Sequence, residues 1–414
     1  MLKSIPGTKD ILPDEVSWWQ KIEEISRNIF SLYNYKEIRT PLIEEETLFN
    51  RSLGKDTQVI QKQMFLIKKG KDVYALRPEA TASIVRAYIE NNLDKTSRFI
   101  KLYYMGPMFR LERPQKGRMR QFHHLGAEAI GSQDASLDVE IISLADNLLK
   151  SFLIDGYKIK INSLGCLKDK KKLAQILHQG LKNKINKLCL DCRARFKRNT
   201  LRILDCKNDA CREIINKLDI QDKHLCPDCK NHFNQVVQGL DSLKSDYEIS
   251  SYLVRGLDYY TRTVFEITHQ NLGSQDALGA GGRYDNLVSV LGGPDVGAIG
   301  FAFGIERLLL ATIQKPQFRS QNLVYLITLG EDAKQSGLTL LDNLRKAGIS
   351  ADTDYEGKSL KGSMRKANDS SARYVLIIGE DEIKKNTLTL KDMISGEQRE
   401  VKAENIITEL KAQP

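Results

Sequence analysis

The stretch from residue 104 to residue 131, YMGPMFRLERPQKGRMRQFHHLGAEAIG, constrains the fold most, because two apolar runs there enclose a basic loop. The runs Phe99 to Phe109 and Phe122 to Ile130 have the aromatic, β-branched and small apolar composition of strands. Between them the pattern is interrupted by the turn residues Pro114, Gln115, Lys116 and Gly117. The segment therefore predicts a hairpin of two strands joined by an arginine-rich loop.

The basic side chains of this predicted hairpin have the chemistry of a polyphosphate site. A planar guanidinium can bond two phosphate oxygens at once. We expect Arg110, at a strand end, to fix an α-phosphate, while the ring of Phe122 offers a face on which a base can stack. The loop can supply further cations from Arg113, Arg118 and Arg120. Composition alone leaves open the alternative of a solvated basic hairpin without a ligand.

Further segments place charged, hydroxyl and aromatic side chains beside predicted strands and helices. A helix is expected from Ala82 to Ile89, and another carries Arg307. Glycines in two of the segments would let the backbone approach a ligand closely. The segments are LRPEAT at 76–81, VRGLDYYTRTVFE at 254–266, GAGGRYDNLV at 279–288 and GAIGFAFGIERLLL at 297–310.

Together these motifs resemble the class II aminoacyl-tRNA synthetases, and within that class the bacterial histidyl-tRNA synthetases. The hairpin resembles the second signature of the class, and FGIER around Arg307 resembles the third. Residues 39–49, with Pro41, resemble the first signature, which in the family builds the dimer interface. The segments at 76–81, 254–266 and 279–285 are similar to elements particular to the histidine enzyme. The resemblance runs from Gly7 to near the C-terminus.

The resemblance implies an α+β fold in three parts. A catalytic core with an antiparallel sheet flanked by helices is expected at 1–164 and 250–314. It is interrupted at 165–249 by a basic, cysteine-bearing and mostly helical insertion. A polar linker at Lys315, Pro316, Gln317 and Ser320 precedes an anticodon-binding α/β domain at 322–414. Its βαβ order predicts a parallel or mixed sheet, with strands at 323–329, near 350 and at 374–378 and helices at 333–347 and 360–368. A generic α/β domain that serves only dimerisation is the alternative for this part.

The charge of the chain is concentrated in the insertion. The 414 residues carry a formal net charge of +10. Residues 168–230 hold 17 lysines and arginines against 8 aspartates and glutamates, whereas residues 322–414 hold 14 against 15. The surplus predicts contact between the insertion and tRNA phosphates. The chain lacks an apolar run of membrane length and its first ten residues are polar, so we expect a cytoplasmic protein with no membrane contact.

The resemblance also implies a reaction, partners and roles for residues. The family activates L-histidine with ATP and Mg²⁺, transfers it to tRNA(His), and acts as a homodimer. The catalytic side chains are expected to be Arg255, Arg110 and Arg307. ATP is expected to contact Arg110, Glu112, Arg118, Phe122 and Arg307. Histidine is expected to contact Glu79, Ala80, Thr81, Arg110, His124, Glu128, Arg255, Tyr259 and Tyr260.

Several of these side chains have simpler readings. Glu79 could cap a helix, and Glu128 could pair with an arginine of the loop. Tyr259 and Tyr260 could be core aromatics. The sequence departs from the family at His124, where glutamine is common. A protonated His124 would repel the substrate ammonium, so we expect histidine affinity to fall on the acid side.

The seven cysteines include two CxxC pairs, at Cys189/Cys192 and Cys226/Cys229. Such pairs have the spacing of a tetrahedral zinc site, although 33 residues separate them. Packed free thiols are the reading we favour, with no metal assigned. Cys166 stands apart and is expected in the core.

Two other classes of function remain. A catalytically inactive paralogue that regulates ATP phosphoribosyltransferase would keep the fold, but such regulators usually lack the phosphate arginines and the C-terminal domain. A plain RNA-binding module would explain the basic insertion and leave the other motifs without a role.

Overall fold

The computed structural model describes residues 2–54, 57, 59–115, 117–218, 220–312 and 323–412. The chain divides into two compact units, Met1–Lys315 and Pro316–Pro414. Lys116 of the predicted turn and the predicted linker at 315–320 lie outside the described residues. Among the helices of the described ranges, none combines the length and the apolar composition that crossing a bilayer requires.

The first unit is built on an eight-stranded sheet in the order β1-β5-β6-β11-β10-β9-β7-β8. Only the two edge pairs, β1 with β5 and β7 with β8, are parallel; the other pairs are antiparallel. The predicted hairpin is confirmed as the pair β5–β6. The strands are β1 (Lys36–Glu37), β5 (Ile100–Phe109), β6 (Gln121–Ile130), β7 (Tyr157–Ser163), β8 (Glu248–Ile249), β9 (Thr261–His269), β10 (Ala277–Arg283) and β11 (Ala298–Gly304).

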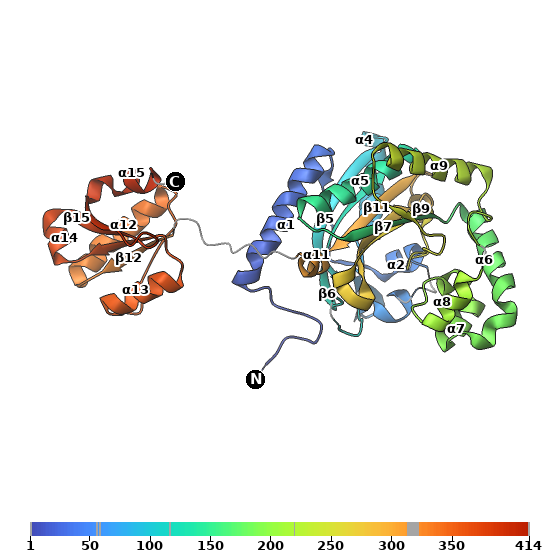
Figure 1. Cartoon of the computed structure of the whole chain (residues 1–414), viewed down its shortest axis with the longest axis horizontal. Coiled ribbons are helices and arrows are strands. Elements are labelled where there is room, and N and C mark those ends of the chain that lie inside the picture. The colour runs from blue at the N-terminus through green and yellow to red at the C-terminus, as the bar shows by residue number, and fades with distance from the viewer. Residues whose placement is uncertain are drawn as a thin grey trace. The chain divides into compact units, whose positions relative to one another are not determined.

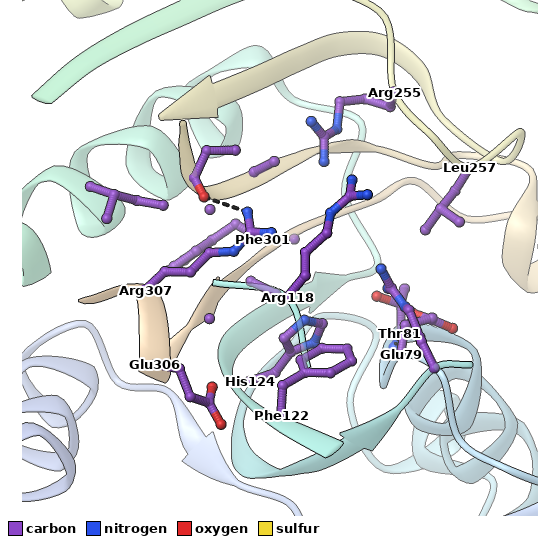
Figure 2. Close-up of a pocket in the computed structure, with 18 of the residues that line it drawn as sticks. Glu79, Thr81, Arg118, Phe122, His124, Arg255, Leu257, Phe301, Glu306 and Arg307 are labelled. Carbon is purple, nitrogen blue, oxygen red and sulfur yellow. Dashed lines mark hydrogen bonds between the residues drawn. The ribbon is translucent and has the colours of Figure 1, made fainter. Parts of the chain in front are cut away.

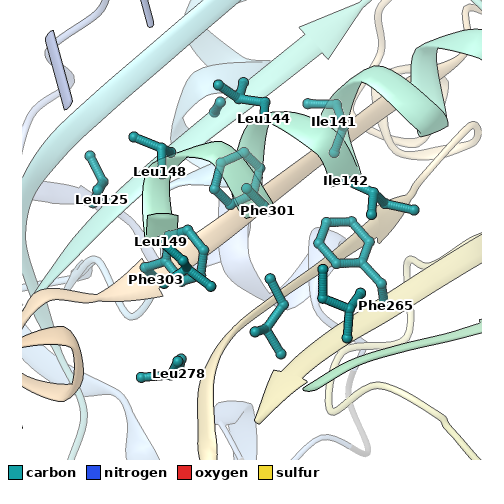
Figure 3. Packing of buried hydrophobic residues seen from close by; sticks show 14 of the residues in the cluster. Leu125, Ile141, Ile142, Leu144, Leu148, Leu149, Phe265, Leu278, Phe301 and Phe303 are labelled. Carbon is teal, nitrogen blue, oxygen red and sulfur yellow. The ribbon is translucent and has the colours of Figure 1, made fainter. Parts of the chain in front are cut away.

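One face of this sheet carries the main hydrophobic core. It is covered by α1 (Pro13–Leu32), α5 (Ala135–Ser151), α9 (Pro227–Ser242) and α11 (Ile305–Ala311). Figure 3 shows the leucines and isoleucines of α5 facing the rings of Phe265, Phe301 and Phe303. Alternate residues of β6, including Leu125 and Ala127, are fully buried on this face. Each buried leucine, isoleucine or phenylalanine contributes roughly 1.5–3 kcal/mol, so the core holds the strands in register.

The opposite face is covered by smaller elements. A second core joins α3 (Thr81–Glu90) and α10 (Leu287–Val290) to β5. Beside it lies a three-stranded sheet in the order β2-β4-β3, packed on α2. The strands of this sheet are β2 (Ile43–Glu45), β3 (Phe65–Lys69) and β4 (Asp72–Leu76). The same region contains α2 (Glu46–Ser52) and the π-helical turn η1 (Val59–Gln63), and α4 (Leu93–Thr96) follows α3.

Between β7 and β8, the regular elements of the described residues are all helices. It contains α6 (Leu167–Leu181), η2 (Lys182–Lys187), α7 (Leu190–Arg198), η3 (Thr200–Ile203) and α8 (Asp209–Asn216), followed by α9. Figure 1 shows α6, α7 and α8 as a helical lobe beside the sheet, and we call these three helices with η2 and η3 the insertion lobe. By contrast, α9 packs on α5 in the main core through Val236 and Leu240.

The cysteines of this region do not group as a single zinc site, which their spacing would allow. The two CxxC pairs lie in separate clusters, so a single site formed by both pairs is wrong. The expectation for Cys166 is also wrong, because this thiol joins Cys226 and Cys229 instead of standing apart. Folding brings each pair to a different part of the helical segment, which sequence spacing does not reveal.

A buried ion pair links the sheet to α5. Arg283 at the end of β10 donates to Asp138 of α5 at 2.7 Å, and both side chains are 0% exposed. Arg283 also donates to Asp285 at 3.1 Å and to the carbonyls of Ser132 (2.9 Å) and Asp134 (2.6 Å). Burial raises the pKa of Asp138 to about 6, and the guanidinium opposes that rise.

The second unit contains a five-stranded mixed sheet in the order β13-β12-β14-β15-β16. Strands β13, β12 and β14 are parallel to one another, which confirms the expected βαβ order. The pairs β14–β15 and β15–β16 are antiparallel. The elements are β12 (Val324–Thr328), α12 (Glu331–Lys346), β13 (Ala351–Thr353), α13 (Leu360–Asp369), β14 (Tyr374–Ile378), α14 (Glu380–Lys385), β15 (Thr387–Asp392), β16 (Gln398–Lys402), η5 (Ala403–Asn405) and α15 (Ile406–Lys411).

The Arg283 pair should contribute far more to stability than a surface pair. Replacing Arg283 by methionine leaves Asp138 buried without its cation, and we expect the free energy of unfolding to fall by about 3–5 kcal/mol. The control is Arg27→Met, because Arg27 pairs with Glu23 at 3.1 Å with its side chain 43% exposed; its loss should stay below about 1 kcal/mol. Urea unfolding followed by the fluorescence of Trp18 and Trp19 reports on this unit, and equal losses would contradict the expectation.

Candidate active site

A cavity opens on the sheet face opposite the main core, and most of the predicted site residues line it (Figure 2). The side chains come from the β5–β6 hairpin, the start of α3, the segment before β9, and β10, β11 and α11. The predicted residues that line it are Glu79, Thr81, Arg110, Glu112, Arg118, Phe122, His124, Glu128, Arg255, Tyr259, Tyr260 and Arg307. Ala80 is not among the lining residues; it packs in the core beneath α3.

One end of the cavity is cationic, and its arginines are held mainly by backbone carbonyls. Arg110 Nε donates to the carbonyl of Pro78 at 2.9 Å, and its guanidinium lies 5.3 Å from the centre of the Phe122 ring. Arg307 donates to the carbonyls of Gly117 (2.9 Å) and Ala277 (2.6 Å). Burial lowers the pKa of Arg307, and the charges of Arg118 and Arg110 lower it further. An anion placed here would relieve that repulsion.

Glu112 is the carboxylate closest to the loop arginines at this end. Arg118 Nε lies 3.2 Å from Glu112 Oε2, and Arg110 Nη1 lies 4.0 Å from its Oε1. The other two arginines of the loop, Arg113 and Arg120, do not line the cavity. Arg120 Nε instead donates to the Glu112 carbonyl at 3.4 Å.

Arg255 reaches the cavity from the segment before β9. Its Nη1 donates to Glu266 at 2.8 Å, and its guanidinium lies 6.0 Å from the Tyr260 ring centre. Its buried Nε has no hydrogen-bond partner among the described residues. Burial alone would lower the pKa of Arg255, but Glu266 and Tyr260 hold it above its usual value. Arg255 therefore has one side fixed by Glu266 and a donor free for a ligand.

The other end of the cavity is acidic. Glu128 accepts from the hydroxyl of Thr81 at 2.7 Å and from the hydroxyl of Tyr284 at 2.6 Å. Burial raises the pKa of Glu128 to about 8, although the two hydroxyls oppose the rise. This carboxyl is paired with two hydroxyls and with no loop arginine. It can therefore exchange a proton near neutral pH.

Glu79 both caps a helix and faces the cavity, so both readings of this residue stay open. Its two carboxylate oxygens accept from the backbone N–H groups of Thr81 (2.7 Å) and Ala82 (2.9 Å), so it caps the start of α3. It also faces the cavity. Burial raises its pKa, and the two backbone donors oppose that rise. Tyr259 and Tyr260, with ring centres 4.6 Å apart, likewise pack against each other and line the cavity.

His124 lies between the two ends, edge-on to Phe122 with ring centres 5.1 Å apart. Its Nδ1 is buried without a hydrogen-bond partner among the described residues. Burial lowers the pKa of His124 well below its ordinary value, and Arg110 and Arg307 lower it further. The lowered pKa favours the neutral ring on the acid side, which weighs against the expected acid-side loss of affinity. The neighbouring His123 has a structural role, since its Nδ1 lies 2.9 Å from Glu306 and its ring meets Trp19.

Sequence reasoning missed side chains that complete this site. Tyr104 and Tyr284 line the acidic end, Glu306 lines the cavity below the hairpin, and Glu266 fixes Arg255. Tyr284 was within the GAGGRYD motif, but its spacing did not reveal its partner Glu128. A glycine within a strand leaves room for one of these side chains. Gly300 lies opposite Glu128, and a Cβ on it would fall 1.7 Å from Glu128 Oε2.

The arrangement has two chemically distinct halves within reach of one another. Guanidiniums and an aromatic face at one end suit a nucleoside polyphosphate. Carboxylates and hydroxyls at the other end, with the imidazole of His124 between the two, suit a small ligand that carries an ammonium and a polar ring. Arg255 lines the same cavity, and its Nε has no partner among the described residues.

Known proteins resemble the chain over its full length. A model of the histidyl-tRNA synthetase family matches residues 7–308, and one of the anticodon binding domain matches residues 323–413. A histidine–tRNA ligase from Halothermothrix orenii is 44% identical over 99% of this chain and 99% of its own length. One from Desulforamulus reducens is 43% identical over 100% of both chains.

Solved structures share the fold. The apo histidyl-tRNA synthetase of S. aureus is 35% identical, with a TM-score of 0.81 over 99% of this chain and 100% of that one. A chain from Bacillus halodurans, described as an ATP phosphoribosyltransferase regulatory subunit/histidyl-tRNA synthetase, is 22% identical with a TM-score of 0.67, over 92% of this chain and 98% of its own, and shows the fold alone. The extent of the matches, together with the hairpin, the motifs and the two units, places this chain in the histidyl-tRNA synthetase family.

Proposed function

We propose that the cavity joins L-histidine to ATP, giving histidyl-adenylate and pyrophosphate, and then passes the histidyl group to the terminal adenosine of tRNA(His). The chain is a histidine–tRNA ligase by its family and its full-length relatives. The observation that carries the proposal for this site is the meeting of a cationic end and an acidic end in one cavity.

The chemistry requires positioning and charge stabilisation more than a strong protein nucleophile. The histidine carboxylate attacks the α-phosphorus of ATP, and negative charge grows on the phosphate oxygens. In our proposal Arg110 and Arg255 stabilise that charge, Arg118 and Arg307 hold the outer phosphates, and Phe122 stacks on the adenine. Glu112 is the carboxylate that a Mg²⁺ ion accompanying the phosphates would meet.

The acidic end selects the amino acid. We assign Glu79 and Thr81 to the substrate ammonium, and Glu128 with Tyr260 to the imidazole. Because Glu128 has a pKa of about 8, its carboxyl can match either protonation state of the ring as the substrate binds. Buried polar groups of this kind are left unpaired by an apolar amino acid, which the site would therefore reject.

The remaining parts of the chain have proposed roles that follow the family. The second unit would bind the anticodon, and the basic insertion would contact tRNA phosphates in a cytoplasmic enzyme. We keep the boundaries 1–164 with 250–314, 165–249 and 322–414 as functional divisions. A homodimer would cover the apolar side chains that the small sheet exposes, namely Leu42, Ile43, Leu66 and Ile67, which are 40–50% exposed.

Amino-acid-dependent pyrophosphate exchange tests the activity directly. The full-length chain should support exchange with L-histidine and Mg·ATP, and each of the other nineteen amino acids should be slower by roughly 10⁴-fold or more. Omitting tRNA should not abolish the exchange, because adenylate formation precedes transfer. An absence of histidine-dependent exchange would indicate a regulatory paralogue instead.

Two arginines of one loop provide a matched test of the cationic end. Arg118 lines the cavity and Arg120, two residues later, does not. Arg118→Ala should raise the KM for ATP roughly 10- to 100-fold, because a charge-assisted phosphate contact is lost. Arg120→Ala should change it by less than about twofold. Equal effects in the exchange assay would show that general loop charge, and no specific contact, binds the phosphates.

The neutral state of His124 gives a prediction for pH. A lowered pKa means that the imidazole gains its proton only below the range that is ordinary for histidine, so we expect it to stay uncharged in mildly acidic solution. The profiles of the KM for histidine in the wild type and in His124→Gln should therefore be parallel across mildly acidic pH. An acid-side rise confined to the wild type would show that His124 is protonated there.

A further inference from the structure

The seven cysteines of the chain all lie within two compact clusters in and beside the insertion lobe. In each cluster the four potential ligand atoms lie within 4.8 Å of one another. The first cluster consists of Cys189, Cys192, Cys206 and Cys211, and the second consists of Cys166, Asp169, Cys226 and Cys229. Chance packing of thiols does not require every cysteine of a 414-residue chain to meet three other potential ligands.

The spacing of the sulfur atoms suits a single ion better than a disulfide. Zinc–sulfur bonds of about 2.3 Å in a tetrahedron place the sulfurs roughly 3.8 Å apart. Cys189 Sγ and Cys206 Sγ lie 3.9 Å apart, whereas a disulfide would bring them to about 2.05 Å. All seven cysteines are free.

The potential ligands occupy a repeated position in the fold. Helices α6, α7 and α9 each begin with one ligand at the N-cap and carry another at the third residue, as Cys166/Asp169, Cys189/Cys192 and Cys226/Cys229. The partial positive charge of a helix N-terminus favours a thiolate. Backbone N–H groups add to this in the first cluster, since Cys189 N lies 3.2 Å from Cys211 Sγ and Asn208 N lies 3.5 Å from Cys206 Sγ.

Asp169 supplies an independent observation for the second cluster. The residue is only 4% exposed. It accepts from the backbone N–H groups of Cys226 (3.1 Å) and Cys166 (3.3 Å), which are themselves members of the cluster. Among the described residues no lysine or arginine forms an ion pair with this carboxylate, and a divalent ion would compensate its charge.

We infer that each cluster binds one Zn²⁺ ion, held by four thiolates in the first site and by three thiolates and a carboxylate in the second. Each thiol loses its proton on binding. The first ion joins the start of α7 to Cys206 in the segment after η3 and to Cys211 of α8, and the second joins α6 to α9. The second ion thus attaches the insertion lobe to the helix that packs in the main core. Neither site touches the cavity, so the ions would be structural.

Metal analysis of the full-length chain, purified without added zinc or chelator, tests the inference. Mass spectrometry should find about two zinc ions per chain, and less than about a tenth of an ion would overturn it. Cys206→Ser and Cys226→Ser should each lose about one ion, whereas the control Ile203→Val, at a fully buried position in the lobe core, should retain both. A cysteine variant that keeps both ions would overturn the site to which it belongs.

A second measurement does not depend on the folding of variants. A mercurial reagent added to the wild-type chain should release zinc, detected with a metal-binding dye, in step with the modification of its thiols. Co²⁺ exchanged into the chain should show the intense absorption of tetrahedral sites and thiolate-to-cobalt charge transfer. Thiols that react without metal release, or cobalt with only weak octahedral absorption, would contradict the assignment.

Discussion

The alternation of side chains along β6 is the constraint on which both the core and the cavity depend. Successive residues of a strand point to opposite faces of the sheet. Accordingly, His124 and Glu128 line the cavity while Leu125 and Ala127 are buried in the main core. A shift of one residue would place a carboxylate in the core and a leucine against the ligand. Pairing with β5 on one side and β11 on the other prevents that shift.

The cationic end owes its character to the way in which its arginines are held. Carbonyl oxygens accept from Arg110 and Arg307, and the Glu112 carboxylate stands 4.0 Å from Arg110, so these side chains are oriented with little loss of charge. Full carboxylate pairing would fix them equally well but would cancel the attraction for phosphate. The buried Arg283 illustrates the opposite solution, since Asp138 and Asp285 compensate its charge and it serves stability. Arginines of this chain thus differ by their partners: carboxylates compensate Arg283, whereas carbonyls orient Arg110 and Arg307.

Local sequence patterns were sufficient to predict the elements and most of the residues that line the cavity. They were not sufficient to predict which residues far apart in the sequence become partners. The hairpin and β14 could be predicted because composition and turn residues mark their ends, and the cavity residues because they lie in recognisable motifs. The cysteine partners could not, since Cys166 and Cys229 meet only after four helices have packed. The neutral state of His124 and the bond from Tyr284 to Glu128 likewise depend on burial and on strand register, which no short segment contains.

The hydrogen-bonded chain from Thr81 through Glu128 to Tyr284 has a consequence for how the site can evolve. Its three members come from α3, from β6 and from the turn after β10, and Gly300 of a fourth segment leaves the space that Glu128 occupies. Changing any one of them leaves a buried partner unpaired or removes the space it needs. Under the assignment proposed for the acidic end, a change of amino-acid specificity would therefore require several substitutions together. The arrangement would in that way guard the meaning of a codon against single mutations.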